Sequence, residues 1–155
     1  MIAFTVHAVP VAQPRGRAAV SKSGKPFVRS ANAGHAINGF KGAVAYAAAQ
    51  AYTGPPLDIP LRMRIVFVMP RPGGMVWKNK PMPRAPYAPK GRHDWDNLGK
   101  GVCDALNQKL YSDDGRIAQV TVEKWIAAGD EQPHVEIQIE ALDQSRPLTN
   151  QPDLW

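Results

Sequence analysis

Four segments of the chain place apolar side chains at every second position, which is the pattern of half-buried β-strands. These segments are residues 2–9, 61–69, 116–124 and 135–139. In the second of them, Leu61, Met63 and Ile65 alternate with Arg62 and Arg64. A turn of mainly polar residues joins the last two segments, so we predict that they pair with each other as a hairpin.

Two further segments repeat apolar residues at every third or fourth position, which predicts helices. The first spans residues 31–52 and stops before Gly54 and two prolines. It is rich in alanine and nearly free of charge. A helix with so few solvating side chains is expected to be covered on both sides, by the sheet and by a partner subunit.

The second predicted helix begins near two aspartates, Asp94 and Asp96, either of which is a suitable N-cap. Its apolar face consists of Leu98, Val102, Ala105, Leu106 and Leu110. Two glycines, Gly99 and Gly101, stand in its first turns, where each costs about 1 kcal/mol relative to alanine. Their presence suggests a close approach of backbone or ligand.

Together these elements predict an α+β fold, with a mixed or mainly antiparallel sheet flanked by two main helices in a single compact domain over residues 1–141. Residues 142–155 indicate a polar tail. No apolar run approaches the ~20 residues that span a bilayer, and no basic region precedes an apolar stretch at the N-terminus. We therefore expect a cytoplasmic protein without a membrane partner. The single cysteine, Cys103, excludes an internal disulfide, and we expect it to serve packing alone.

Charge is divided unevenly along the chain, although the net charge is only +6. Residues 1–93 hold fourteen Lys or Arg and one acid, a balance of +13. Residues 94–155 hold five Lys or Arg and twelve acids, a balance of −7. The basic stretch favours a polyanionic partner, and we interpret it as a nucleic-acid footprint. The alternative is that basic loops only keep the protein in solution.

Two basic loops, residues 10–30 and 70–92, carry the candidate DNA contacts. The candidates are Arg15, Arg17, Lys22 and Lys25 in the first loop and Arg71, Lys78, Lys80 and Arg92 in the second. The second loop also holds Trp77 and Tyr87, aromatic side chains of the kind that stack on bases. The alternative for this loop is a surface excursion without function.

Acidic residues gather where the second loop becomes the second helix. Asp94 and Asp96 stand two apart, Lys100 follows, and an Asp113-Asp114 pair closes the segment. If Asp94 is extended, the first two side chains point the same way and can share one ion. Mg²⁺ takes oxygen ligands and keeps several waters, so few carboxylates suffice. The alternative is structural: Asp94 caps the helix, and Lys100 pairs with acids at i±4 for about 0.2–0.5 kcal/mol each.

The run Asp94-Trp95-Asp96-Asn97-Leu98-Gly99-Lys100, then Asp104-Ala105-Leu106-Asn107, then Asp113-Asp114, closely resembles the D-x-D-N-x-x-K-x-x-x-D-A-L…D-D signature of RusA-type Holliday-junction resolvases. The basic segment 9–17 is similar to the loop after the first strand in phage-type members. The resemblance implies Mg²⁺, with Mn²⁺ as a substitute, bound by Asp94, Asp96 and Asp114, with Asp113 as the alternative to Asp114. It also implies that Lys100 is needed for cleavage and that the protein is a homodimer.

On this basis we expect a Mg²⁺-dependent endodeoxyribonuclease that resolves four-way DNA junctions by paired strand cuts during recombination and repair, in a bacterial or phage-infected cell. A closed two-fold dimer would match the approximate two-fold symmetry of such a junction. Two alternatives stay open: a branched-DNA-binding accessory protein without catalysis, and a general flap or single-strand nuclease.

Overall fold

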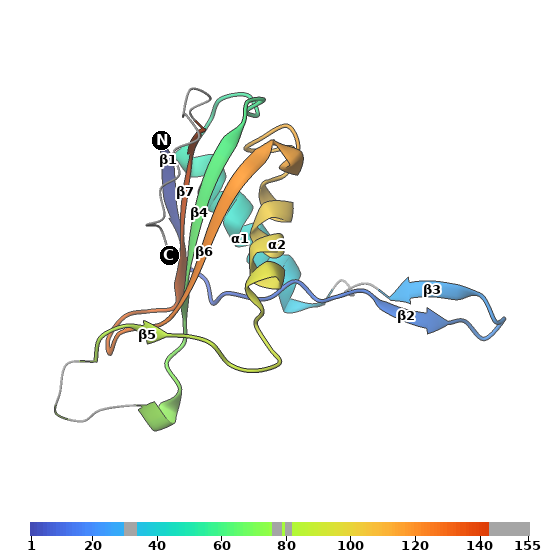
Figure 1. The fold of residues 1–155 in the computed structure, drawn as a ribbon, viewed down its shortest axis with the longest axis horizontal. Helices are drawn as coiled ribbons and strands as arrows, with labels where there is room; N and C mark the ends of the chain where they lie inside the picture. The colour runs from blue at the N-terminus through green and yellow to red at the C-terminus, as the bar shows by residue number, and fades with distance from the viewer. Residues whose placement is uncertain (30–33, 76–78, 80–81, 143–155) are drawn as a thin grey trace, which may run out of the picture.

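Five strands form one mixed sheet in the order β1-β7-β4-β6-β5 (Figure 1). Their bounds are Ile2–Val6 for β1, Leu61–Met69 for β4, Ala85–Pro86 for β5, Ile117–Ile126 for β6 and His134–Ala141 for β7. The central strand β4 pairs in parallel with β6 and antiparallel with β7. The computed structural model describes residues 1–29, 34–75, 79 and 82–142, so the predicted tail falls almost entirely outside the described residues.

The predicted hairpin between residues 116–124 and 135–139 is wrong. Although β6 and β7 follow each other in sequence, β4 lies between them in the sheet. The reason is that β4 is apolar on both faces in its second half, where Ile65, Val66, Phe67 and Val68 are all buried. A strand that needs cover on both faces is stable at the centre of a sheet. It therefore lies between β6 and β7, so these two strands cannot pair with each other as a hairpin.

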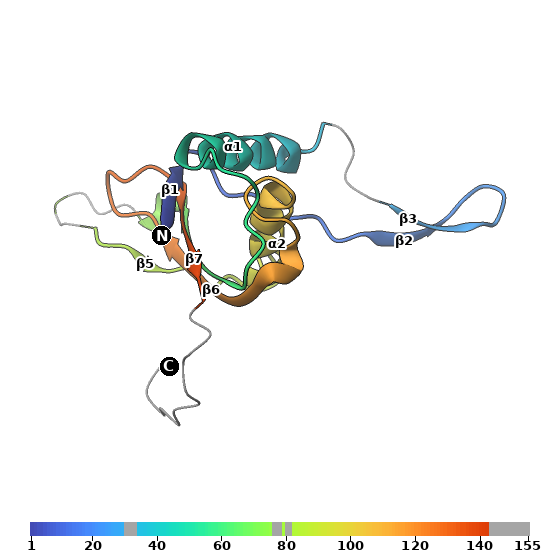
Figure 2. The same ribbon diagram turned by 90° about the horizontal axis from the view of Figure 1, so that it is seen from above.

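Two helices, α1 (Ala36–Ala51) and α2 (Trp95–Leu106), cover one face of the sheet (Figures 1 and 2). They pack against each other, while α1 also contacts β1 and α2 also contacts β6. The buried stripe of α1 consists of Ile37, Phe40, Val44 and Ala48, and that of α2 includes Leu98, Val102, Ala105 and Leu106. The predicted α+β class is confirmed. Within the described residues, no helix is long and apolar enough to cross a membrane.

The helix ends differ from the predicted ones for local reasons. Helix α1 begins at Ala36, because His35 is extended and its Nδ1 accepts a hydrogen bond from the amide of Ile37 at 3.0 Å. Helix α2 ends at Leu106 rather than near residue 110, because Gln108 adopts a left-handed φ of 60°. Leu110 is still buried, but in the turn that follows the helix.

The basic segment after β1 forms an arm that projects from the domain (Figures 1 and 2). Its strands, β2 (Arg17–Val20) and β3 (Pro26–Arg29), pair with each other in a separate two-stranded sheet. The backbone amide of Ser21 donates to the carbonyl of Lys25 at 2.9 Å, which closes the turn between the two strands. Lys22 and Lys25 are exposed at the tip. An isolated two-stranded ribbon is at best marginally stable alone, so the arm is suited to being held by a partner.

The face of the sheet opposite the helices carries several ion pairs and is not uniformly basic. Arg62 pairs with Glu140, and Arg64 pairs with Glu123 at 2.7 Å. Arg84 contacts two acids, Glu131 at 2.6 Å and Glu136 at 2.7 Å. Acids of the C-terminal half therefore neutralise several cations of the basic N-terminal half. The uneven charge along the sequence persists mainly in the arm and around the start of α2.

Candidate active site

Two aspartates meet at the start of α2. Asp94 occupies the N-cap position with an extended backbone, and its side chain makes no capping hydrogen bond. Asp96 lies in the first turn of the helix. One guanidinium nitrogen of Arg15, Nη2, lies 3.1 Å from Oδ2 of Asp94 and 3.5 Å from Oδ2 of Asp96. Both carboxylates thus converge on a single cationic group, as their spacing in the sequence predicted.

The segment that carries Arg15 is fixed to α2 through its backbone. The amide of Gln13 donates to the carbonyl of Asn97 at 2.9 Å. A β-carbon built on Gly101 would lie 3.6 Å from the carbonyl oxygen of Val11 and 3.2 Å from Cδ1 of Ile37. Gly101 therefore provides the close backbone approach that its place in the helix suggested. Gly99 is different, because its nearest neighbour is a side-chain atom of Val122 at an ordinary 3.6 Å.

His93 turns the chain into α2 with a strained backbone, since its φ of 53° is left-handed. Lys124 Nζ donates to the carbonyl of His93 at 3.0 Å, and the hydroxyl of Tyr87 lies 2.6 Å from His93 Nδ1. Burial lowers the pKa of His93, and the cations Arg92 and Lys124 lower it further. The predicted base-stacking role of Tyr87 has no support here, because its ring packs against the core and its hydroxyl holds His93.

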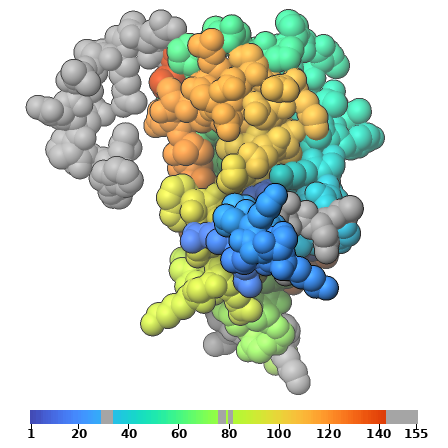
Figure 3. Space-filling view, turned by 90° about the vertical axis from the view of Figure 1, so that its right-hand side faces the viewer, coloured from blue at the N-terminus to red at the C-terminus, as the bar shows by residue number. Residues whose placement is uncertain are grey.

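An open, polar cleft of about 450 Å³ lies beside the two aspartates. Its lining comes from the segment after β1, from His35 at the start of α1 and from the loop before α2: Ala12, Gln13, Pro14, Arg15, Arg17, His35, Gly91, Arg92, His93, Asp94 and Asn97. Three arginines thus line the same cleft as Asp94, and Arg15 contacts it directly. In Figure 3 the blue arm stands in front of the yellow segment that leads into α2. The cleft therefore has the charge and the position expected of a phosphate-binding surface.

Lys100 lies one turn further along α2, on its exposed side. Its Nζ is 3.3 Å from Oδ1 of Asp104, and Nζ of Lys41 on α1 is 3.6 Å from Oδ2 of the same carboxylate. The predicted i,i+4 pairing is therefore present between Lys100 and Asp104, while Asp96 pairs with Arg15 instead. Asp104 thus pairs with two lysines, and if one contact is lost the other lysine still neutralises its carboxylate.

The Asp113-Asp114 pair lies at the other end of α2. The side chain of Asp113 accepts a hydrogen bond from the amide of Gly115 at 2.8 Å and caps the short 3-10 turn η2 (Asp114–Arg116). The hydroxyl of Tyr111 donates to the carbonyl of Cys103 at 2.8 Å, so the segment that leads to Asp113 and Asp114 runs beside the C-terminal half of the helix. Cys103 is seven residues beyond Asp96, which is ~10 Å along a helix. Burial is the main reason that the Cys103 pKa rises to about 11, which suits an unreactive packing residue.

Comparison with known proteins identifies the family. The family described as endodeoxyribonuclease RusA matches residues 8–140, which include the arm, both helices and four of the five strands of the sheet, β1 lying before the matched range. The chain belongs to the RusA family. It is also 33% identical over 141 residues to the uncharacterized protein YqaN of Bacillus subtilis strain 168, covering 89% of this chain and 94% of that protein. The RusA match agrees with the resemblance seen in the sequence motif and indicates deoxyribonuclease activity.

The donor set at the start of α2 fits the divalent cation that a RusA-type nuclease implies. Asp94 and Asp96 already converge on one cation, and both are about half exposed, so water can supply the other ligands that Mg²⁺ requires. Within the described part of the chain, no three His, Cys, Asp or Glu side chains lie close enough together to hold a metal ion. The structure therefore brings together two of the predicted ligands, and Asp113 and Asp114 stay predictions.

The predicted DNA contacts of this RusA member fall into three groups. Arg15, Arg17 and Arg92 line the cleft, and Lys22 and Lys25 lie exposed on the arm. Lys78, Lys80 and the aromatic Trp77 lie outside the described residues. Arg71 has a different role, because it donates to the carbonyls of Ala127 at 2.9 Å and Pro83 at 2.7 Å. Its guanidinium thus holds the loop after β4, and a DNA contact of Arg71 stays a prediction.

Sequence reasoning missed two features of the site. The pairing of Arg15 with Asp94 joins residues 79 positions apart, so no local pattern reveals it. In the sequence, Asn97 stands out only as part of the motif. In the structure its side-chain Oδ1 accepts a hydrogen bond from Arg15 Nε at 3.4 Å, and its carbonyl accepts one from the amide of Gln13. The motif itself was the signal for Asn97, since this amide directly follows the second aspartate.

Proposed function

We propose that this protein is a Mg²⁺-dependent endonuclease that resolves four-way DNA junctions by cutting two opposed strands, in the cytoplasm of a bacterial or phage-infected cell. Membership of the RusA family supports the nuclease activity. The observation that carries the proposal is the convergence of Asp94 and Asp96 on one cation beside a cleft lined by arginines. Two neighbouring carboxylates repel each other, and positive charge beside them reduces that repulsion.

In this proposal Asp94 and Asp96 hold Mg²⁺, which when bound supplies an activated water and neutralises charge on the scissile phosphate. Both carboxylates sit at the positive end of α2, where the backbone amides also favour a phosphate group. Asp113 uses its side chain to cap η2, so Asp114 is the freer of the two implied third ligands, and the chain would have to bring it from the other end of α2 to this site.

Lys100 is the residue that we assign to the charge developing on the leaving oxygen. Its side chain is exposed and lies one turn beyond Asp96, on the same side of α2. An ammonium group with three donors and a flexible stem can exchange Asp104 for a phosphate without moving the helix. The exchange does not leave Asp104 alone, because Lys41 also pairs with it.

DNA binding in this proposal combines the cleft with the arm. Arg15, Arg17 and Arg92 contact phosphates near the cut, while Lys22 and Lys25 contact the backbone further away. Arm and cleft are continuous, because Arg17 both lines the cleft and begins β2. Phosphate neutralisation of this kind makes affinity fall steeply with added salt.

The test of the proposal compares three substrates of matched sequence: a synthetic four-way junction, a flap and a linear duplex. With Mg²⁺, the full-length protein should cut the junction at paired positions and leave the flap and the duplex almost intact. Equal cleavage of the flap or of single strands would favour a general nuclease. Tight binding of the junction without any cleavage would favour a non-catalytic accessory protein.

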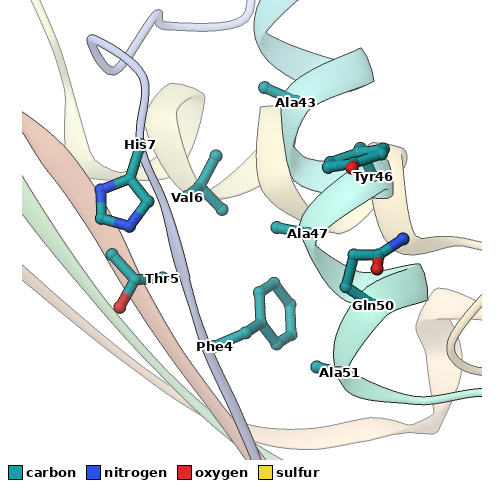
Figure 4. A pocket seen from close by; sticks show the side chains of 9 residues that line it. All are labelled: Phe4, Thr5, Val6, His7, Ala43, Tyr46, Ala47, Gln50 and Ala51. Atoms are coloured by element: carbon teal, nitrogen blue, oxygen red, sulfur yellow. The ribbon is translucent and has the colours of Figure 1, made fainter.

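The proposed homodimer has a candidate surface in an apolar cleft of about 500 Å³ between β1 and α1 (Figure 4). Phe4 and Val6 point from β1 toward α1, and Ala47 and Tyr46 line the helix side. Tyr46 is 70% exposed, and β1 is an edge strand, which is prone to contact another chain. A second subunit here would cover the face of α1 that has few charged side chains, which is the cover that we expect from the alanine-rich sequence of this helix.

We expect Tyr46→Glu to convert a dimer into a monomer, because it places a charge in the apolar contact. Sedimentation velocity measures the change, and circular dichroism shows whether the fold is retained. Gln50, which lines the same cleft, offers a matched control, since Gln50→Glu adds the same charge without removing an apolar ring and should have a smaller effect. A wild-type protein that sediments as a monomer would contradict the homodimer.

A further inference from the structure

We propose that Arg15 is a positioning residue that holds the place of the metal ion: it pairs with Asp94 and Asp96 in the metal-free protein, and transfers to a DNA phosphate when the metal and DNA bind. This inference rests on the proposed function, because it assumes that the two aspartates hold a divalent cation.

The contacts of Arg15 are those of a stand-in cation. Its Nη2 lies 3.1 Å from Asp94 and 3.5 Å from Asp96, and in both carboxylates the contact is made by Oδ2. Mg²⁺ binds carboxylate oxygens at about 2.0–2.1 Å, so it would compete for the same oxygens. Two cationic groups on these two atoms would repel each other. Metal binding at Asp94 and Asp96 therefore displaces the guanidinium.

The backbone around Arg15 makes such an exchange a side-chain movement. Gln13 is anchored to Asn97 by a 2.9 Å hydrogen bond, and Gly101 leaves room for the segment to run against α2. The side chain of Arg15 is 65% exposed, and those of Asp94 and Asp96 are 47% and 50% exposed. Exposed ion pairs of this kind are weak, so competing ligands can replace them at little cost.

The position of Arg15 supplies its second partner. Two residues later the chain enters the arm at Arg17, and both arginines line the cleft with Arg92. DNA that lies along the arm would therefore bring phosphates to Arg15. The guanidinium fork binds phosphate oxygens in pairs, as it binds carboxylates. Arg15 thus protects the aspartates from mutual repulsion before binding and adds positive charge to the substrate site afterwards.

Metal affinity of the DNA-free, full-length protein tests the first half of the proposal. Mn²⁺ binding is measured by electron paramagnetic resonance for wild type, Arg15→Gln and Arg17→Gln. We expect Arg15→Gln to bind Mn²⁺ at least about 5-fold more tightly, a coupling in the usual range. Arg17→Gln removes the same charge from the same cleft but not from an ion pair with these carboxylates, so its effect should be much smaller. Arg15→Lys should fall between the two, because an ammonium keeps the charge without the fork.

Cleavage at saturating metal tests the second half. Arg15→Gln should cut the junction about 10²-fold more slowly than wild type, although its metal site is tighter. Unchanged Mn²⁺ affinity in Arg15→Gln overturns the place-holding role, and tighter binding with full activity overturns the transfer to phosphate. Failure of the proposed function looks different: wild type would then bind no more Mn²⁺ than a protein lacking both Asp94 and Asp96.

Discussion

Replacing Asp94 or Asp96 by asparagine is expected to abolish junction cleavage, with a loss of at least about 10³-fold, while junction binding persists. Asparagine has the same size and shape as aspartate but lacks the charge that holds a divalent cation. The fold should be unaffected, because Asp94 makes no capping hydrogen bond and both side chains are half exposed. DNA affinity should stay the same or rise slightly, because each change removes a negative charge from the cleft.

Gel-shift titration in Ca²⁺ or chelator measures binding, and product formation in Mg²⁺ measures cleavage. Asp130→Asn is the matched control, because Asp130 is an exposed aspartate in the turn between β6 and β7 and should keep wild-type activity. Retained cleavage in the Asp94 and Asp96 variants would remove the metal site from the start of α2. Loss of binding together with cleavage would instead assign both residues to the DNA surface.

Lys100→Met is expected to slow cleavage by about 10²–10³-fold with little change in junction affinity. A cation positioned beside the charge that develops in the transition state changes the cleavage rate by a factor of this size. A single phosphate contact makes a smaller contribution to the affinity for a large DNA substrate. Methionine keeps the length of the aliphatic stem and removes only the ammonium. Single-turnover rates, measured with enzyme in excess over junction, separate this effect from product release.

The control for Lys100 is its ion-pair partner. Asp104→Asn breaks the 3.3 Å contact with Lys100 and the 3.6 Å contact with Lys41. If Lys100 only served an i,i+4 pair, both variants would lose about 0.2–0.5 kcal/mol of stability and cut equally well. The catalytic assignment predicts that Asp104→Asn cuts nearly as fast as wild type. Equal rates for Lys100→Met and wild type would contradict it.

The strands and helices were predictable from apolar periodicity where one face of the element is buried and the other is exposed to solvent. The alternation of Leu61, Met63 and Ile65 placed β4, and the apolar stripe from Leu98 to Leu106 placed most of α2. Periodicity cannot place a helix end, however. The end of α2 is set by the left-handed backbone of Gln108, which no apolar pattern encodes.

Strand order required information that local alternation does not carry. Alternation in β6 and β7 suggested a hairpin, because sequence neighbours usually pair. The signal against it was present in β4, where the run from Ile65 to Met69 is continuously apolar. Such a run is typical of a strand covered on both faces, and only a central position supplies that cover.

The site was predictable as far as it is local. Spacing alone placed Asp94 and Asp96 on a common cation, because both lie at the entry to one helix. The surroundings were not predictable in this way. Arg15 reaches the aspartates only because the segment after β1 crosses α2, and Arg71 is consumed by backbone carbonyls of a distant turn. Which basic residues face DNA is thus decided by tertiary contacts and not by the charge of the sequence.

The same limit applies to Asp114. The family resemblance implies that Asp114 acts with Asp94 and Asp96, whereas the segment that leads to Asp114 packs through Tyr111 beside Cys103, further along α2. Helix geometry explains the separation, since a short connection after α2 returns the chain to the C-terminal half of that helix. Asp94 and Asp96, at the start of α2, are therefore the central residues of the proposed metal site.

The most direct measurement is single-turnover cleavage of a preformed junction complex, followed as Mg²⁺ is added. We expect wild type to stay bound and inactive in chelator and to cut two opposed strands once Mg²⁺ is present. We expect the double variant Asp94→Asn, Asp96→Asn to bind the junction equally well and to leave it intact at every Mg²⁺ concentration. Cleavage by wild type in chelator, or by the double variant in Mg²⁺, would contradict a metal-dependent site at the start of α2.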